Sequence, residues 1–543
     1  MLSQPSPGGK VTGVRSRRTF SGAGLLRSGS EHRPAVGRGV YEMPHLALLA
    51  ILAVLGAGLL AGCGLTGSPQ GSSGGQYVRQ PARGLFSWPG NEPSVPPKGA
   101  DTETAIPPEF FGMIVNQVSH MPPTVPFGSF RFWDCGANWP LLQTAQDTFG
   151  WAPLDKYLAS LKEKGVSDVL YTLGRTPKWA SMRPNDDTCN YSGLGPAHYG
   201  NCHLWADLNP DGTGTNDTWK RWVMAIARHV NDPGYLQTHA RIKYWEPWNE
   251  FYRSTTLANY SGSMSYQGTY AQLVRITEDT RCMITGKGSV NGQPCAATPI
   301  DATAKIVAPS GAANFPGGLR ISENFLYCDA SPKSGTQCTT GRRGADAVDV
   351  LNYHLYVPRE PLEVNLTSWL RNLKATLEPP ELAKPLWSGE NSWGVPGRND
   401  FDDPDLQAGF VARFHLLAWS LGVSREFWYS WETDVGQLWS PDSGLAKAGV
   451  AYEQIYDWMV GSTMSSLCRP QGSVWTCGLT RPGGYQGLAV WDTSRTCNNG
   501  NCGTVPYQVG PQYTQYRDLA GKKVNITGRT VPIGIKPILL ENH

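Results

Sequence analysis

The chain has 543 residues, and its 47 lysines and arginines nearly balance its 44 aspartates and glutamates, which leaves a net charge of +3. So small a charge argues against a strongly basic nucleic-acid-binding protein and gives no reason to expect an anionic polymer as ligand. The length allows roughly two to four ordinary domains, or one large α/β barrel with an addition. The 20 tryptophans and 22 tyrosines suit ordinary cores, and aromatic faces also stack on the apolar C–H face of sugar rings.

The first hundred residues predict export and a tether. Residues 46–62 form an almost unbroken apolar run, whose end Leu60-Ala61-Gly62-Cys63 resembles the lipobox of bacterial lipoproteins. The resemblance implies cleavage before Cys63 and a lipid on its sulfur. The protein would then be anchored to the outer face of a bacterial membrane, or secreted. An uncleaved membrane helix is the alternative, although the run is at the lower length limit for spanning a bilayer.

Eleven cysteines remain when Cys63 is set aside, and ten of them fall into five close pairs along the chain: Cys189/Cys202, Cys282/Cys295, Cys328/Cys338, Cys468/Cys477 and Cys497/Cys502. Short-loop disulfides of this kind suit an oxidising compartment, although spacing alone leaves the connectivity open. Cys135 is left over, and we expect it to be a small buried apolar residue. No CxxC pair or nearby histidine cluster suggests zinc.

From about residue 107, short apolar runs alternate with helical stretches, which is typical of a parallel sheet with helices outside it. Eight runs predict strands: Phe110–Val118, Ser129–Cys135, Asp168–Leu173, Ile242–Glu250, Lys305–Pro309, Ala347–Tyr356, Pro385–Asn391 and Glu426–Trp431. Six stretches predict helices: Leu154–Lys164, Thr218–Val230, Tyr266–Cys282, Leu362–Leu377, Pro404–Leu421 and Ala448–Val460. Only a short proline-rich stretch separates the first two runs, so we expect no full helix there.

Eight strands in this rhythm predict an α/β fold, a closed (β/α)8 TIM barrel, over residues 101–460. An open doubly wound sheet is the alternative, but no GxGxxG follows a strand. Residues 461–543 predict a small antiparallel β domain of the sandwich type, with strands at Val474–Leu479, Gly487–Trp491, Tyr507–Val509, Gln515–Asp518, Val524–Ile526 and Ile533–Ile538. Ahead of the barrel we expect an extension or misassigned start at 1–42, a lipoprotein signal peptide at 43–63 and a flexible Gly/Ser/Pro linker at 64–100.

Acidic residues stand at two of the predicted strand ends. The fourth run ends in Trp248-Asn249-Glu250, and the seventh ends in Glu390-Asn391. Active residues of a barrel lie at the carboxyl ends of its strands, so we expect Glu250 and Glu390 to meet. A protonated and an ionised carboxyl group together suit cleavage of a glycosidic bond. Glu246 should lie deeper in the fourth strand, as an interior carboxylate with its hydrogen bonds satisfied.

These motifs resemble the retaining glycoside hydrolases of clan A, which carry an Asn-Glu pair on the fourth strand and a second glutamate on the seventh. Within that clan the sequence is most similar to glycoside hydrolase family 39 and its relatives, through Phe111-Gly112-Met113, the segment from Gly128 to Asp134, and Thr176-Pro177-Lys178-Trp179-Ala180. The resemblance covers about residues 107–460. The region after residue 460 resembles the β-sandwich often attached to such barrels.

The resemblance implies a role for each matching residue. Glu250 would be the general acid and then the general base, and Glu390 would be the nucleophile that forms a covalent glycosyl-enzyme. Asn249 would bind the sugar 2-hydroxyl, in a contact that strengthens in the transition state. Many relatives have proline directly after the acid/base glutamate, whereas this chain has Phe251, which puts the local shape of the subsite in doubt.

Further residues are implied to support this pair. Arg131 and Tyr356 would hold Glu390 ionised, because a nearby cation and a hydrogen-bond donor both favour the charged form. His354 would contact the sugar or tune Glu250, and Trp431 would form the floor of the subsite. We also expect Trp179 to contact sugar. The alternatives are a core histidine, a structural ion pair and tryptophans used only in packing.

A second site is suggested by Asp207-Leu208-Asn209-Pro210-Asp211-Gly212, which matches the start of a calcium loop with Asp207, Asn209 and Asp211 as ligands. Thr218 stands where that loop needs a glutamate, and a plain turn before a helix is the alternative. Apart from this structural calcium, we expect no cofactor.

The sequence thus predicts a retaining glycoside hydrolase that cleaves β-glycosidic bonds of an extracellular poly- or oligosaccharide by double displacement. Its partners would be the carbohydrate and, through Cys63, a membrane, with no role for nucleic acid. A non-catalytic sugar-binding surface lipoprotein on a glycosidase-like barrel is the alternative. A metal-dependent hydrolase is disfavoured, because neither His-x-His nor His-Glu-x-x-His occurs. Retention predicts that the two carboxyl groups lie about 5–5.5 Å apart.

Overall fold

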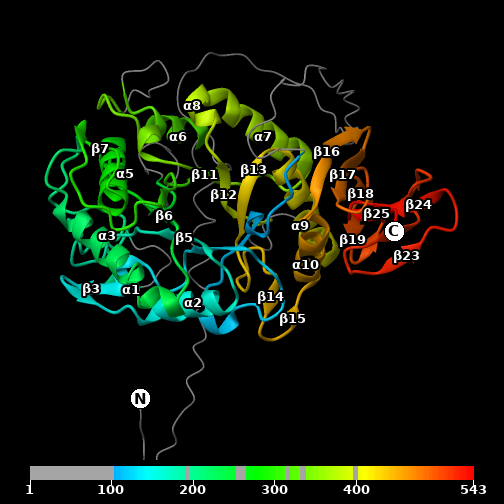
Figure 1. Ribbon diagram of the computed structural model, residues 1–543, viewed down its shortest axis with the longest axis horizontal. Helices are drawn as coiled ribbons and strands as arrows, with labels where there is room; N and C mark the ends of the chain where they lie inside the picture. Colours follow the sequence, from blue (N-terminus) through cyan, green and yellow to red (C-terminus); the bar gives the residue numbers. More distant parts are fainter. Residues whose placement is uncertain (1–102, 190–194, 252–264, 313–317, 330–337, 395–400) are drawn as a thin grey trace, which may run out of the picture. The chain divides into compact units, whose positions relative to one another are not determined.

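The structure is a computed structural model (Figure 1), and the residues it describes are 103–543 without 190–194, 252–264, 313–317, 330–337 and 395–400. The predicted extension, the signal peptide with Cys63, and the linker lie outside the described residues. Among the helices that are described, none combines the length and the apolar character that crossing a membrane requires.

A parallel sheet forms the centre of the fold, in the order β10-β11-β12-β13-β1-β2-β5-β6-β9. Its strands are β1 (Phe111–Met113), β2 (Ser129–Phe132), β5 (Asp168–Thr172), β6 (Tyr244–Glu246), β9 (Lys305–Ile306), β10 (Gly311–Ala312), β11 (Leu351–His354), β12 (Leu386–Asn391) and β13 (Val423–Trp428). The two ends of this order, β9 and β10, belong to one chain segment, and the Ala308 N–H donates to the Val350 carbonyl at 2.9 Å. The sheet therefore closes on itself, and the predicted (β/α)8 barrel is confirmed.

Seven of the eight predicted runs contain one of these strands, and most of those strands are shorter than the run. The eighth run, Glu426–Trp431, was placed too late in the chain, because β13 begins at Val423 and ends at Trp428. The fifth run contains β9, and β10 continues the same barrel position. Six apolar residues on or beside six of the strands form a cluster of their own, as expected for the filled interior of a barrel: Ile114, Leu170, Val307, Val350, Trp387 and Phe427.

The main helices are α2 (Ala152–Glu163), α3 (Asp217–Val230), α5 (Tyr270–Thr285), α6 (Gly318–Leu326), α7 (Leu362–Thr376), α9 (Pro404–Ser420) and α10 (Lys447–Met459), with short helices α1 (Trp139–Leu142), α4 (Tyr235–Thr238) and α8 (Pro379–Leu382). Local signals set their ends: Asp403 accepts hydrogen bonds from two backbone N–H groups at the start of α9, and Thr269 and Gln272 form a capping box on α5. Between β1 and β2 the structure has only the single-turn helix Val118–His120, as predicted. Helix α6 was not predicted, because its stretch begins at a glycine within a segment rich in turn residues.

The chain after residue 460 is antiparallel, as predicted. One sheet has the order β16-β17-β18-β25-β22-β23, and a separate pair joins β21 to β24. The bounds are β16 (Thr463–Gln471), β17 (Val474–Arg481), β18 (Tyr485–Asp492), β19 (Cys497–Asn498), β20 (Asn501–Cys502), β21 (Val505–Gln508), β22 (Gln515–Arg517), β23 (Lys523–Asn525), β24 (Thr530–Ile533) and β25 (Ile538–Glu541). Apolar side chains from both layers pack together, which gives the sandwich-type core: Val490, Val509, Val531, Ile533, Ile538 and Leu540.

One predicted strand in this region is wrong. The run Ile533–Ile538 is not a strand but the link between β24 and β25, which pair with different partners. Gly534 and Pro537 lie in this link, and Pro537 has no N–H to donate to a sheet ladder. The long strand β16 was missed, because its polar sequence has little apolar alternation.

The remaining strands form small hairpins: β3 (Gln143–Ala145) with β4 (Thr148–Phe149), β7 (Ser289–Val290) with β8 (Gln293–Pro294), and β14 (Trp439–Ser440) with β15 (Gly444–Leu445). All five predicted disulfide pairs are present: Cys189–Cys202, Cys282–Cys295, Cys328–Cys338, Cys468–Cys477 and Cys497–Cys502. Cys135 is free and buried, as expected.

Candidate active site

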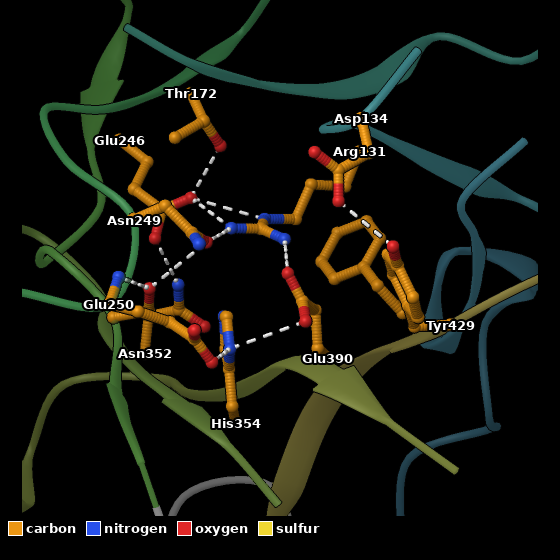
Figure 2. Close-up of polar contacts among 12 residues, drawn as sticks. Arg131, Asp134, Thr172, Glu246, Asn249, Glu250, Asn352, His354, Glu390 and Tyr429 are labelled. Carbon is orange, nitrogen blue, oxygen red and sulfur yellow. Dashed lines mark hydrogen bonds and ion pairs between the residues drawn. The ribbon is translucent and has the colours of Figure 1, made fainter. Parts of the chain in front are cut away.

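Side chains from separate strands meet at one end of the barrel (Figure 2). Arg131 comes from β2, His354 from β11 and Glu390 from β12, while Asn249 and Glu250 lie in the segment that follows β6. These strands run parallel in one closed sheet, so their carboxyl ends lie at the same end of the barrel even though the residues are far apart in the sequence. The structure therefore brings together most of the polar residues that the sequence singled out.

Arg131 is the centre of the polar contacts (Figure 2). Its side chain is fully buried, and Nη1 donates to Glu390 Oε1 at 2.7 Å. Nε and Nη2 donate to Glu246 Oε2 at 3.1 and 2.8 Å, and Nη2 also donates to Asn249 Oδ1 at 2.6 Å. One guanidinium thus orients two carboxylates and one amide.

Glu390 is surrounded by groups that favour its ionised form. Besides Arg131, the Tyr356 hydroxyl donates to Oε2 at 3.0 Å, and His354 Nδ1 lies 3.4 Å from the same oxygen. Burial raises the pKa of the Glu390 carboxyl above its ordinary value, while the positive charges of His354 and Arg131 act against that rise. The hydrogen-bond geometry, with a donor on each oxygen, is that of a carboxylate.

Glu250 has a different environment. Its backbone is in the left-handed region, with φ of 47°, and its N–H donates to the Ser310 hydroxyl at 2.9 Å. The side chain is 23 % exposed, and Oε1 lies 2.8 Å from His354 Nδ1. Burial acts to raise the pKa of Glu250, but the hydrogen bond and the charge of His354, together with the charges of Arg131 and Arg175, outweigh it, so that the pKa lies below its ordinary value. Part of that lowering requires a charged imidazole, so the proton affinity of Glu250 depends on the protonation state of His354.

The two glutamates are close. One oxygen of Glu250, one oxygen of Glu390 and a ring nitrogen of His354 all lie within 4.8 Å of one another. Three ligand atoms at this spacing could also hold a cation. A second group of metal-ligand type, Cys189, Cys202 and His203, offers no thiolate, because its two cysteines form a disulfide.

Asn249 is held by its oxygen and leaves its nitrogen unused. Oδ1 accepts from Arg131 and, at 3.4 Å, from the Ser310 hydroxyl. In the described part of the chain, Nδ2 of Asn249 is buried and has no hydrogen-bond partner. This amide N–H is therefore a donor available to a bound hydroxyl group.

The two predicted tryptophans differ in their surroundings. Trp431 follows β13, is buried and stacks on Trp439 with the ring planes 5° apart. Trp179 is half-buried, donates its indole N–H to the Gln143 carbonyl at 2.9 Å and meets Trp139 edge to face. No contact that the structure records for Trp179 reaches the two glutamates.

Four polar residues near this site were not singled out from the sequence. Asp134, just after β2, accepts a hydrogen bond from the Tyr429 hydroxyl at 2.9 Å (Figure 2), and Arg175 Nη2 lies 3.9 Å from the other oxygen of Asp134. Asn352, on β11, donates to Glu246 at 3.0 Å. Their signals in the sequence were a position on or near a predicted strand and, for Asp134, its place in the segment from Gly128 on which the resemblance rests; their contacts depend on how the strands are arranged.

The calcium candidates form a turn. Asp207 Oδ2 accepts from the Thr218 N–H at the start of α3, at 3.0 Å, and Asp211 Oδ1 accepts from the N–H and the hydroxyl of Thr213. Asn209 donates to the Thr213 hydroxyl at 3.0 Å. These contacts match the alternative of a turn before a helix.

No protein-family model and no curated protein matches the chain. Solved structures do. A family 39 glycoside hydrolase from the gut symbiont Bacteroides cellulosilyticus WH2 is 14% identical with a TM-score of 0.51, and the match covers 80% of each chain. The GH39 enzyme from Xanthomonas axonopodis pv. citri is 13% identical with a TM-score of 0.51, over 81% of this chain and 95% of that one. The fold is therefore the one that the family 39 motifs predicted.

Proposed function

We propose that the protein is a retaining glycoside hydrolase, with Glu250 as acid/base and Glu390 as nucleophile, that cleaves β-glycosidic bonds of an extracellular poly- or oligosaccharide. The observation that carries the proposal is the close approach of oxygens of Glu250 and Glu390, within 4.8 Å, at the carboxyl end of the barrel. Retaining enzymes have carboxyl groups about 5–5.5 Å apart, whereas inverting enzymes need about 6.5–9.5 Å to admit a water molecule.

The reaction has two displacements. A Glu390 oxygen forms a bond to the anomeric carbon while the bond to the leaving oxygen breaks, and that oxygen takes the proton of Glu250. Glu250, now ionised, removes a proton from water, whose oxygen attacks the same carbon and releases Glu390. The free N–H of Asn249 would donate to the sugar 2-hydroxyl during both steps.

The contacts of the two carboxyl groups support this division of roles. Glu390 has a donor on each oxygen, and one of these donors is the permanently charged Arg131. Glu250 is the more exposed of the two, at 23 % against 7 %, and among the described residues its carboxyl group is hydrogen-bonded by His354, a side chain without a fixed charge. Glu250 therefore lacks the permanently charged partner that Glu390 has in Arg131, which suits the acid role.

The proposal includes a location outside the cytoplasmic membrane, which is based on the motifs in the first hundred residues. Cleavage before Cys63 and lipidation would tether the enzyme outside the cytoplasmic membrane, where a polysaccharide is accessible and disulfides persist. The five disulfides are consistent with that compartment.

The first experiment is to measure the release of reducing sugar by the purified protein across polysaccharides and aryl β-glycosides, beside Glu390→Gln and Glu250→Gln. We expect hydrolysis by the parent and a loss of about 1000-fold or more in both variants. Proton NMR of the first product should show the β-anomer before mutarotation.

An α-anomer as first product would overturn the double displacement. Sugar binding on a glycan array without hydrolysis of the bound glycan would favour the alternative, a sugar-binding surface lipoprotein. Unimpaired hydrolysis by Glu390→Gln would overturn the assignment of the nucleophile.

A further inference from the structure

Glu246 is a third carboxylate beside the proposed catalytic pair, and the reaction above makes no use of it. Its side chain is fully buried and makes four hydrogen bonds. Oε2 accepts from Nε and Nη2 of Arg131 and from the Thr172 hydroxyl at 2.6 Å, while Oε1 accepts from Asn352 Nδ2 at 3.0 Å. Every partner is a donor, so the contacts are those of an ionised carboxylate (Figure 2).

The guanidinium of Arg131 is therefore divided between two negative charges. Two of its nitrogens bind Glu246, and the third binds Glu390 at 2.7 Å. The side chains of Arg131 and Glu246 have no exposed surface, and that of Glu390 is 7 % exposed. Charges in such a buried region are screened weakly by solvent. The charge of each carboxylate therefore reduces the extent to which Arg131 stabilises the ionised form of the other.

We infer that Glu246 is a positioning residue for the reaction proposed above: it fixes the orientation of Arg131 and takes up part of its positive charge, so that Glu390 remains a strong nucleophile. Without the negative charge of Glu246, the positive charge of Arg131 would stabilise the Glu390 carboxylate alone. The ionised form of Glu390 would then be favoured more strongly, and its oxygen would be a weaker base and a weaker nucleophile.

Glu246→Gln tests this inference with little change of shape. The new amide would place an N–H group opposite Asn352 Nδ2, but Asn352 Oδ1 is buried and, among the described residues, has no hydrogen-bond partner. A rotation of the Asn352 amide by half a turn therefore restores an acceptor to face the new donor. The amide oxygen of the variant still accepts from Arg131, so the change removes mainly the charge.

The measurement is the pH profile of kcat/KM for an aryl glycoside that the parent hydrolyses. Removing a fixed negative charge lowers the pKa of a neighbouring carboxyl group, so the acid limb of Glu246→Gln should move to lower pH by about one unit. On its plateau the variant should be slower than the parent by about 10-fold or more, and the loss should grow with poorer leaving groups, because formation of the glycosyl-enzyme is the impaired step.

Two further variants separate charge from structure. Glu246→Asp keeps the charge with a shorter reach, so its acid limb should stay at the parental pH even where its rate falls. Glu363→Gln alters another buried glutamate that accepts from an arginine, Arg413 at 3.1 Å, outside this site. This control should lower the melting temperature and leave the acid limb in place.

The inference would be overturned if the acid limb of Glu246→Gln lay at the same pH as that of the parent. It would also be overturned if the acid limb of Glu246→Asp moved as far as that of Glu246→Gln. Both outcomes would leave the proposed function intact. A parent that hydrolyses no glycoside would overturn the proposed function, and the inference with it.

Discussion

His354 Nδ1 lies 2.8 Å from a carboxylate oxygen of Glu250, and the imidazole has no exposed surface. The ring is a partner of the proposed acid, and its other nitrogen is buried with no hydrogen-bond partner in the described part of the chain. The proton affinity of the acid is therefore set by a neighbour that can itself gain or lose a proton.

His354→Asn tests that relationship. The contact with His354 lowers the pKa of Glu250, so its loss should raise that pKa. The basic limb of kcat/KM, which reports loss of the proton from the acid, should move to higher pH by about one unit. An unchanged basic limb with a lower plateau would mean that His354 only shapes the subsite.

Asn249→Ala should weaken catalysis through a single hydroxyl group of the substrate. The free Nδ2 donor predicts a contact with the sugar 2-hydroxyl, and a donor of this kind contributes about 100-fold to the rate. The parent should therefore lose about that factor on a 2-deoxy glycoside, while Asn249→Ala should lose little more when the substrate already lacks the hydroxyl. Equal further losses on both substrates would place the effect elsewhere, for example in the anchoring of Arg131.

Glu432 makes stability depend on pH. Burial raises its pKa to about 7, against an ordinary value of about 4.3, although the Gln117 N–H donates to Oε1 at 2.7 Å. A raised pKa means that the stabilising contribution is present at low pH and is lost as the pH rises from about 4 through 7. Glu432→Gln should therefore be more stable than the parent at pH 8, by at most about 3 kcal/mol, and equal to it near pH 4.

Thermal unfolding at both pH values measures this difference. Glu163, on α2, is exposed, so Glu163→Gln is a control that should show no such pH dependence. If Glu432→Gln stabilised the protein equally at pH 4 and pH 8, the pH dependence could not come from ionisation of the buried Glu432 carboxyl group.

Gly128→Ala should prevent folding or destabilise the protein by more than about 4 kcal/mol. An added Cβ would lie 2.2 Å from the carbonyl carbon of Pro108 and 2.5 Å from the Glu109 nitrogen, and backbone atoms cannot move aside as a flexible side chain can. At Gly150 nothing lies within 4 Å of the added atom, so Gly150→Ala should melt within a degree or two of the parent. Similar melting temperatures for the two variants would contradict the packing at β2.

Chelation should leave the melting temperature unchanged. Asp207 Oδ2, Asn209 Nδ2 and Asp211 Oδ1 already make hydrogen bonds within the turn and at the start of α3, so we expect the turn to keep its shape without an ion. Scanning calorimetry with EDTA and with added calcium tests this. A fall with EDTA that calcium reverses would restore the calcium-loop interpretation.

Much of the architecture could be predicted from local pattern. Strand and helix periods, and helix stops such as Lys164-Gly165, are properties of short stretches, and eight strands alternating with helices indicate one closed barrel. Because all strands of that barrel end at the same edge, the position of Glu250 and Glu390 at strand ends was enough to predict that they would meet. The disulfide pairs could also be suggested from local pattern, because the two cysteines of each pair lie close together in the sequence.

The contacts between these side chains could not be predicted in this way. The greater depth of Glu246 was expected from its earlier place in the fourth run, but its hydrogen bonds with Arg131, Thr172 and Asn352 depend on the register of β6 against its neighbours. The contact of Asp134 with Tyr429 likewise joins residues 295 positions apart.

The amino-acid sequence by itself therefore determined the barrel, the edge at which Glu250 and Glu390 lie and the residue types gathered there, because these follow from periodicity within short segments. Only the tertiary structure decided that Arg131 is shared by Glu246 and Glu390 and that His354 faces Glu250. Such contacts depend on the closure and stagger of the whole sheet, which no short segment encodes.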